Sequence, residues 1–301
     1  MDLCLSKLDF YQKNGFVRFE NAISDSLLLK LRSLSDQLEE SAQKEFFEGK
    51  IRNQYNMSVE TSEPRLFRYN DLLFDSPEII IELLASPMMM AICKDLCGDQ
   101  CVPMQADLVY KYPHPHPHIA WHHDAPHSRQ YPYLNVGVYL DDANLNDGCL
   151  RYIPNSQHNI TDIYELSSQY GWEIPNVVQQ PAKAGDILVQ DMMILHSSEP
   201  KRSPGVRRTI YIELRPFSAI IENGKQSKQW AELRKEWMSY IIQAAAPENI
   251  PEGWYEFYGK PKYDLNTLVE LIKEKWEPPI PAVWSHKNVE HPNYPTPADL
   301  R

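Results

Sequence analysis

The sequence lacks any apolar run long enough to cross a membrane. No stretch among its 301 residues approaches the roughly 18 consecutive apolar residues of a membrane span. Residues 1–10 contain no basic region followed by an apolar run, so we predict no signal peptide. The last three residues are not a peroxisomal signal of the Ser-Lys-Leu type. We therefore expect a cytoplasmic protein without a membrane partner.

Positive charge is also scarce. The 30 Lys and Arg residues are outnumbered by 41 Asp and Glu residues, which gives a formal net charge of -11. A nucleic-acid-binding protein needs a basic surface against the phosphates, and an anionic membrane surface makes the same demand. The composition therefore argues against both kinds of partner.

Cysteines are few and odd in number, five in all. Cys93, Cys97 and Cys101 recur at every fourth residue. A zinc site is one interpretation of this spacing, but the pattern is more typical of one face of a buried helix end. Without the cysteine pattern of a disulfide scaffold, a reducing compartment is the expectation.

The distribution of apolar residues predicts a mainly β protein with flanking helices. A chain of 301 residues forms one large domain or two average ones. We expect a single domain over residues 1–301, with helices in 1–100, a β core over about 101–217 and a helical, aromatic-rich extension over 218–301.

The amino-terminal part is predicted to alternate helix, strand and helix. Asn14 and Gly15 end the first helix, residues 16–19 alternate like a strand, and Ser24 or Asp25 caps the next helix. Residues 42–75 are expected to be loop with short elements. Residues 77–98 are expected to be one helix, with Pro77 in its first turn and Gly98 at its end.

The middle of the chain consists of short β-branched or aromatic runs separated by turn residues. This pattern predicts a sandwich or barrel, with strands over residues 107–112, 134–140, 149–153, 186–189 and 208–214.

Five of the seven tryptophans lie beyond residue 220, where the pattern becomes helical again. An apolar helical face is predicted there, made of Trp230, Leu233, Trp237, Tyr240, Ile241 and Ala244. This extension either packs on the core or roofs a ligand pocket, and the two roles are compatible.

Two histidines and a carboxylate form the strongest chemical signal. In a strand, His122 and Asp124 point to the same face, because side chains alternate. His196 ends the apolar run Met192–Leu195, which we expect to be a strand beside the first pair. Two histidines and one carboxylate on one side of a metal form the facial triad of non-haem Fe(II) oxygenases.

A candidate for binding a cosubstrate carboxylate follows the second histidine. Arg207 lies eleven residues after His196, across a turn-rich segment that would return it close to the metal. A buried guanidinium grips a carboxylate with two parallel hydrogen bonds. Arg208 would point to the other face, and Ser198 is a candidate hydroxyl partner for the same carboxylate.

These motifs, in this order, resemble the phytanoyl-CoA dioxygenase (PhyH) family of Fe(II)- and 2-oxoglutarate-dependent oxygenases. The resemblance covers residues 10–216. It includes Asn14 to Val17, Trp121 to Asp124, Leu140 to Ala143, Asp147 to Leu150, Ile153 to His158, Ala184 to Asp186, and the set of His196, Ser198 and Arg207. Asn155 replaces the family's glycine and also tolerates a left-handed turn.

The resemblance implies a double-stranded β-helix (jelly-roll) core and a set of cofactors. It implies Fe(II) bound by His122, Asp124 and His196, and 2-oxoglutarate bound by Arg207 with Ser198. The expected reaction is hydroxylation of a small-molecule metabolite or natural-product intermediate by O2, with release of succinate and CO2 and with ascorbate as a stimulant. Halogenating relatives replace the carboxylate, so the presence of Asp124 favours oxygen transfer or another oxidation over halogenation. Desaturation, ring formation and epimerisation stay open as alternatives to hydroxylation, because they differ in substrate placement rather than in iron ligands.

Two other functions remain as alternatives. One is a non-catalytic jelly-roll binding protein, although such a protein needs neither the triad nor the arginine. The other is a structural zinc protein, although structural zinc takes four ligands and three are apparent.

Several further residues receive weaker predictions. Asn135 and Tyr139 share a strand face and are candidates for cosubstrate binding, and Gln105 and Lys111 lie on a strand that leads to the site. The remaining candidates divide into a His-Pro segment expected to be a solvated loop (His114, His116 and His118), two histidines beside the triad (His123 and His127), and Trp121, which is expected to pack.

Overall fold

Two antiparallel sheets form the centre of the computed structural model, which describes residues 1–50, 52–58, 63–98, 100–116, 118–126 and 130–301. The larger sheet has the order β1-β9-β6-β11-β4-β3-β2 and the smaller one β12-β5-β10-β7-β8. The larger sheet contains β1 (Phe16–Phe19), β2 (Tyr55–Ser58), β3 (Arg65–Tyr69), β4 (Cys101–Lys111), β6 (Leu134–Tyr139), β9 (Ile187–Asp191) and β11 (Arg207–Pro216). The smaller sheet contains β5 (His122–His123), β7 (Leu150–Tyr152), β8 (Val178–Gln180), β10 (His196–Ser198) and β12 (Val283–Trp284).

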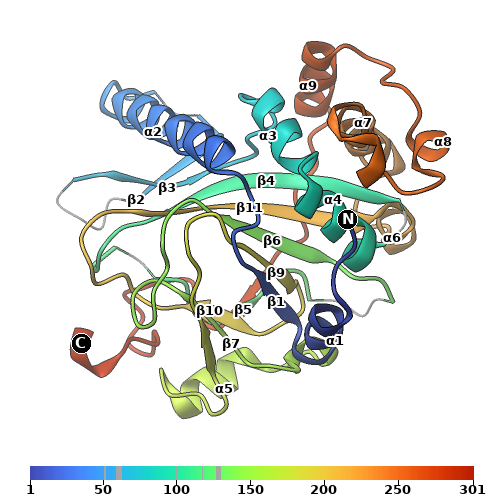
Figure 1. Ribbon diagram of the computed structural model, residues 1–301. Helices are drawn as coiled ribbons and strands as arrows, with labels where there is room; N and C mark the ends of the chain where they lie inside the picture. The colour runs from blue at the N-terminus through green and yellow to red at the C-terminus, as the bar shows by residue number, and fades with distance from the viewer. Residues whose placement is uncertain (51, 59–62, 99, 117, 127–129) are drawn as a thin grey trace.

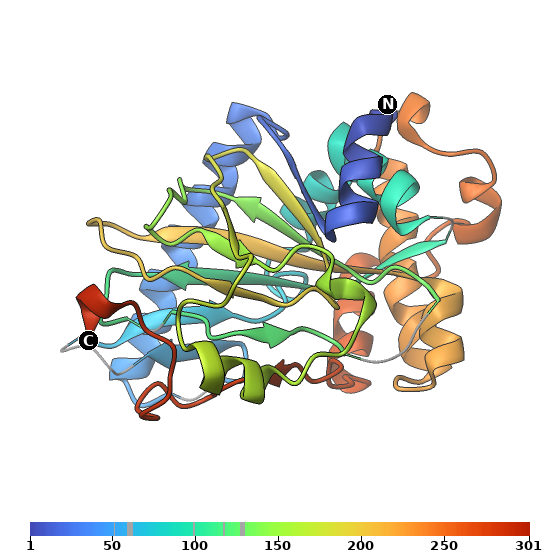
Figure 2. The ribbon, with the colours of Figure 1, turned by 90° about the horizontal axis from the view of Figure 1, so that it is seen from below.

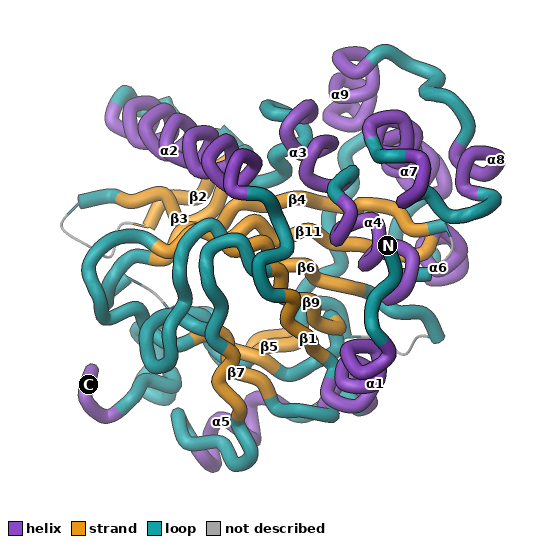
Figure 3. The backbone as a smooth tube through the Cα atoms, in the orientation of Figure 1, coloured by secondary structure: helices purple, strands orange, loops and turns teal. Residues whose placement is uncertain are grey.

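Helices cover the outer face of the larger sheet, and the smaller sheet lies against its other face (Figures 1 and 2). The tube view places most of the helices on one side of the strands (Figure 3). The α-helices are α1 (Leu5–Asn14), α2 (Asp25–Phe47), α3 (Pro77–Leu84), α4 (Pro87–Ile92), α5 (Ile163–Tyr170), α6 (Phe217–Asn223), α7 (Lys228–Ala244), α8 (Trp254–Tyr258) and α9 (Leu265–Glu274).

The amino-terminal elements begin and end where the sequence predicts. Gly15 adopts a φ of 80° after α1 and donates its backbone N–H to Tyr11 O at 2.7 Å, a left-handed helix end that suits glycine. The Ser24 hydroxyl accepts a hydrogen bond from Leu27 N and caps α2. Helix α2 continues to Phe47, so the expected loop begins six residues late, at residue 48 instead of 42.

The single helix predicted over residues 77–98 is wrong. The structure breaks it into α3, α4 and a π-helical turn over Cys93–Cys97. Ser86 is extended, with φ -64° and ψ 150°, because a residue before proline disfavours the helical region, and Pro87 starts the next helix. Cys93 and Cys97 are buried at the end of this segment, as the helix-end interpretation predicts. Cys101 is also buried but starts β4, so the interpretation is wrong for this third cysteine.

The strand predicted over Met192–Leu195 is also wrong. Strand β9 ends at Asp191, whose carboxylate accepts a hydrogen bond from Met193 N at 2.7 Å and whose carbonyl accepts one from Ile194 N at 3.0 Å. These bonds close a turn, and His196 begins the next strand, β10, instead of ending one. The reversal carries the chain from the larger sheet to the smaller one.

The carboxyl-terminal extension packs on the core. Trp230, Leu233, Trp237 and Ile241 are buried on α7, which contacts β4. Tyr240 is half-buried and Ala244 is exposed, so the apolar face is narrower than predicted. No helix in the described part of the chain is both long and apolar enough to span a membrane.

Candidate active site

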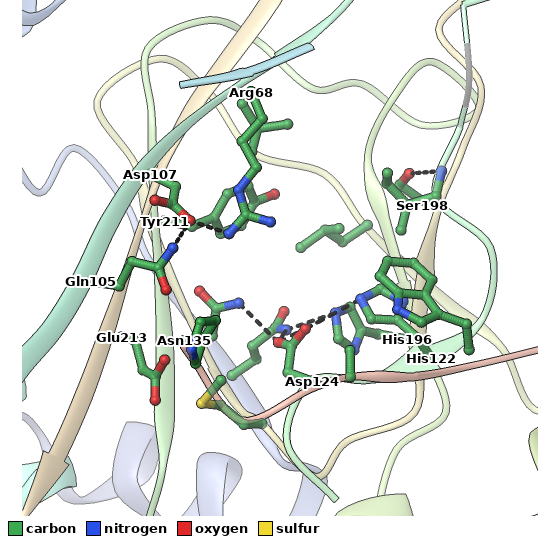
Figure 4. A pocket seen from close by; sticks show the side chains of 18 of the residues that line it. Arg68, Gln105, Asp107, His122, Asp124, Asn135, His196, Ser198, Tyr211 and Glu213 are labelled. Atoms are coloured by element: carbon green, nitrogen blue, oxygen red, sulfur yellow. Dashed lines mark hydrogen bonds and ion pairs between the residues drawn. The ribbon is translucent and has the colours of Figure 1, made fainter. Parts of the chain in front are cut away.

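The strand pair β5–β10 brings the two predicted histidines together. His196 lies directly opposite His122 in this antiparallel pair, and their ring centroids are 4.0 Å apart. Asp124 follows β5 in a bend whose backbone N–H donates to Met192 O at 3.0 Å. Among the described residues, these three are the one set whose potential metal-ligand atoms all lie within 4.8 Å of one another (Figure 4).

Backbone carbonyls fix the orientation of both imidazoles. Nδ1 of His122 lies 2.9 Å from Ala120 O, and Nδ1 of His196 lies 3.0 Å from Ile194 O. A carbonyl only accepts, so Nδ1 carries the proton and Nε2 keeps its lone pair. The Nε2 atoms lie 3.3 Å and 3.7 Å from the carboxylate oxygens of Asp124, which is the arrangement that metal-binding histidines use.

Two amides hold the Asp124 carboxylate. Asn135 Nδ2 lies 2.9 Å from its Oδ2. Gln190 Nε2 lies 3.2 Å from the same oxygen and 2.9 Å from His196 Nε2. Burial opposes ionisation of Asp124, but His196, His122 and the Asn135 amide outweigh it and hold the pKa below its ordinary range. Burial, reinforced by His122, lowers the pKa of His196 to about 3. The set therefore carries a charged carboxylate and a neutral His196 at neutral pH, the forms that bind a metal.

Arg207 is buried on β11 beside His122, Asp124 and His196, which are called the candidate metal-ligand set below. Its guanidinium has no acidic partner in the described part of the chain. Its Nη1 donates to Thr209 Oγ1 at 2.6 Å and to Tyr211 OH at 3.4 Å, both neutral groups. Within the described residues, no carboxylate oxygen lies within 4.0 Å of its guanidinium. Arg208 points to the opposite face and pairs with Asp141, as strand alternation predicts. A buried, uncompensated cation favours binding of an anion.

Ser198 is positioned to donate a hydrogen bond into the same cavity. Its Oγ accepts from Ile119 N at 3.0 Å and from Lys111 Nζ at 2.5 Å. Both lone pairs are then used, so the hydroxyl hydrogen is left for a ligand. Lys111 lies opposite Arg207 in the β4–β11 ladder, and burial, with Arg207 as the next cause, lowers its pKa well below the ordinary value.

A cavity of about 400 Å³ is lined by His122, Asp124, His196, Ser198 and Arg207. Arg68, Gln105 and Glu213 lie across it from His122 and His196 (Figure 4). The carboxyl-terminal extension also lines the cavity, through Pro279, Ile280, Pro281, Ala282 and Trp284. The extension therefore both packs on the core and lines the cavity.

Trp284 contacts the metal-ligand set directly. Its indole stacks on the His122 ring, with centroids 4.0 Å apart and planes 10° apart. Strand β12 holds it there, because Trp284 pairs with His122 and Ser285 N donates to Trp121 O at 2.8 Å. Sequence reasoning missed Trp284, since nothing in the sequence pairs it with β5. It also missed Gln190, although a glutamine in an apolar strand was a usable signal.

The His-Pro segment is not a solvated loop, so that prediction is wrong for two of its three histidines. His114 is exposed, but His116 is 1% and His118 5% exposed. His116 is enclosed by Phe67 and Tyr112, and His118 bonds to Pro295 O at 2.6 Å. Aromatic neighbours and the returning carboxyl terminus exclude the water that the proline pattern suggested.

Of the other weakly predicted residues, some line the cavity and others do not. Gln105 lines the cavity, and the Tyr139 ring lies 5.7 Å from the Arg207 guanidinium carbon. His123 is buried, with Nδ1 2.5 Å from Met193 O, and is not part of the cavity lining. Trp121 packs in a small apolar cluster, as expected. His127 lies outside the described residues.

The family model of phytanoyl-CoA dioxygenase (PhyH) matches residues 11–209. The chain belongs to the PhyH family. A methylphosphonate hydroxylase from Gimesia maris is 22% identical over 77% of this chain and 87% of that protein.

Solved structures share the fold. EvdMO1 is 28% identical, with a TM-score of 0.60 over 70% of this chain, and the present chain spans 49% of its length. AviO1 from Streptomyces viridochromogenes is 26% identical, with a TM-score of 0.58 over 70% of this chain and 93% of AviO1. HygX from Streptomyces hygroscopicus, solved with nickel and 2-oxoglutarate bound, is 16% identical with a TM-score of 0.56 over 72% of this chain and 88% of HygX.

The PhyH match confirms three predictions made from the sequence. They are the family, the jelly-roll core, and the enzyme class of dioxygenase. Binding of Fe(II) and 2-oxoglutarate by this chain stays a prediction. The left-handed Asn155, with a φ of 68°, shows that the one departure from the family's turn is tolerated.

Proposed function

We propose that this chain hydroxylates a small molecule, with Fe(II) held by His122, Asp124 and His196 and with 2-oxoglutarate held by Arg207 and Ser198. The name of the Gimesia relative, a hydroxylase, supports this reaction type. A cavity of about 400 Å³ is in the size range of small-molecule sites.

The observation that carries the proposal is the buried Arg207, whose guanidinium has no acidic partner among the residues that the structure describes. The donor set opposite it carries one negative charge at Asp124. An Fe(II) ion would leave this set one positive charge in excess, and Arg207 adds another. The dianion 2-oxoglutarate balances both, with its 2-oxo acid end at the metal and its distal carboxylate at the guanidinium.

The metal supplies oxygen activation and the oxidative decarboxylation that yields succinate and CO2. The protein supplies geometry. Asn135 and Gln190 hold Asp124 as a carboxylate, and the two carbonyl-bound imidazoles present Nε2. Trp284 and the segment 279–282 line the cavity. Because Asp124 would occupy the third ligand position, a halide has no place there, which argues against halogenation.

Anaerobic binding of 2-oxoglutarate to the Fe(II)-loaded protein tests the proposal. We expect a visible charge-transfer absorption and, in air with a metabolite panel, succinate formation. His196→Ala should abolish both. Arg207→Ala should weaken 2-oxoglutarate binding about 100-fold, because a charge-assisted bidentate contact is worth about 3 kcal/mol.

Matched controls are His158→Ala and Arg52→Ala, which remove exposed residues outside the cavity. They should leave both signals unchanged. An Fe(II)-loaded protein that binds no 2-oxoglutarate would refute the proposal and support a non-catalytic binding protein.

A further inference from the structure

A second cavity of about 630 Å³ adjoins the candidate active site. The two cavities share four lining residues: Arg68, Gln105, Glu213 and Pro279. A ligand that reaches past these residues from the metal-ligand set would therefore enter the second cavity. Both volumes fall in the range of ligand sites, so together they fit a molecule larger than the active-site cavity alone.

Amides and aromatic rings line this second cavity together with charged side chains. Its amides are Asn53, Gln54, Asn70, Gln105 and Gln226, and its aromatic residues are Phe74, Trp230 and Trp276. An amide offers a donor and an acceptor side by side, which matches neighbouring hydroxyl groups. Gln226 already accepts from Arg215 and donates to Pro278 O, and Asn70 donates to Asn53 O, so the ligand-binding amides are those of Asn53, Gln54 and Gln105. Gln105 donates its amide N–H to Asp107 at 2.6 Å, which leaves its Oε1 as an acceptor (Figure 4). Trp276 is 53% exposed and offers a flat apolar face at the rim.

The charged residues of the second cavity balance. Three cations and three anions line it: Arg68, Arg234, Lys273, Asp71, Glu213 and Glu277. Arg234 pairs with Asp71, Arg68 with Asp107, and Glu213 with Arg215. Lys273 pairs with Glu270, and Glu277 accepts hydrogen bonds from Ser227. No excess of positive charge remains for a phosphate or a carboxylate.

We infer that the second cavity binds a neutral, polyhydroxylated unit, such as a glycosyl group, of a substrate whose reacting C–H bond lies at the metal-ligand set. Amide pairs bind the hydroxyls, and the Trp276 ring packs on the apolar face of the unit. Arg68 lies between the two cavities, where Asp107 neutralises its charge and fixes its direction. It contributes hydrogen-bond donors rather than net charge.

The same charge balance disfavours two other substrate classes. An acyl-CoA or a small phosphonate needs cations that are not already paired. The inference rests on the proposed function only for the reaction at the metal, because the second cavity binds its ligand through other residues.

Binding to the metal-free full-length protein tests the inference independently of catalysis. The probes are the disaccharides maltose, cellobiose and lactose, with coenzyme A and methylphosphonate for comparison. Binding is followed by saturation-transfer NMR and calorimetry. We expect at least one disaccharide to bind and neither anion to bind. Trp276→Ala should weaken that binding at least tenfold, and Gln54→Ala should weaken it measurably.

The matched control is Tyr255→Ala, which removes another aromatic ring that is 53% exposed but lies outside the cavity. Its affinity for the disaccharide should equal that of the wild type. Binding of coenzyme A or methylphosphonate without any disaccharide, or equal binding by wild type and Trp276→Ala, would overturn the inference. Disaccharide binding without any 2-oxoglutarate binding to the Fe(II)-loaded protein would refute the proposed function alone.

Discussion

His116 illustrates, at the scale of a single residue, how burial changes the pKa of a side chain. Both ring nitrogens are buried without a hydrogen-bond partner in the described structure. Burial, with Lys111 as the second cause, lowers its pKa from 6.5 to about 4. The ring is therefore neutral in the folded protein at neutral pH. The positive charge that an acidic solution would place on it is not solvated there.

This shift predicts a loss of stability in acid. Below pH 6.5 the unfolded chain binds a proton at His116 that the folded chain binds only near pH 4, so the free energy of unfolding falls between these values. By pH 5 the loss from this residue is about 2 kcal/mol. His116→Phe should remove it. Urea unfolding at pH 7.5 and pH 5 measures the difference.

The matched control for this experiment is His158→Phe, which replaces an exposed histidine. It should keep the acid sensitivity of the wild type. If His116→Phe loses as much stability in acid as the wild type does, the assignment to this residue is wrong. Because His118 is also buried with a pKa of about 4, a residual loss in His116→Phe is expected.

At the scale of elements, three short strands build the metal-ligand set. Strand β5 lies between β12 and β10 in the smaller sheet. The turn after β9 places His196 at the start of β10. The sequence predicted the histidine spacing but not this turn, because an apolar run such as Met192–Leu195 fits a strand and a buried turn equally well. The side chain of Asp191, which closes the turn, decides between them.

Strand β12 leads to a prediction about Trp284. The Trp284 indole stacks on the His122 ring. Strand β12 supplies it from one side of β5, and β10 pairs with the other side. Trp284→Ala should weaken Fe(II) binding by about tenfold, because a lost aromatic pair costs about 1 kcal/mol and frees the ring. Trp284→Phe should restore most of the affinity. Anaerobic Fe(II) titration, followed by quenching of tryptophan fluorescence in the wild type and by calorimetry in the variants, measures this.

A purely structural role of Trp284 would give a different result. Trp284→Ala would then lower the thermal midpoint while Fe(II) affinity stayed at the wild-type value. Since the indole is only half-buried, we expect the opposite pattern, with little change in the midpoint.

At the scale of the whole molecule, the site residues that the sequence predicts are those that lie close to one another along the chain. The pair His122 and Asp124, and the run from His196 to Arg207, follow from motif spacing and strand alternation. Arg68 and Trp284 could not be predicted, because they come from β3 and β12 at opposite ends of the chain and meet the site only through tertiary packing. Residues that line the substrate side are therefore the least readable from sequence.

The candidate site draws on both sheets, so ligand binding should stabilise the whole chain. His122 and His196 lie on the smaller sheet and Arg207 on the larger one. A molecule of 2-oxoglutarate that bridges the metal and Arg207 would tie the sheets together. A ligand present at 100 times its dissociation constant adds about 2.7 kcal/mol, and each kcal/mol raises the midpoint of a large domain by about 2–4 °C.

Anaerobic scanning calorimetry separates the two contributions. We expect Fe(II) to raise the thermal midpoint of the wild type and 2-oxoglutarate to raise it further. His196→Ala should lose both increments, whereas Arg207→Ala should keep the first and lose the second, because its metal-ligand set is intact. A wild type in which zinc alone gives the full increase and 2-oxoglutarate adds nothing would instead indicate a structural zinc site. The second increment, rather than the first, therefore distinguishes an oxygenase from a metal-stabilised fold.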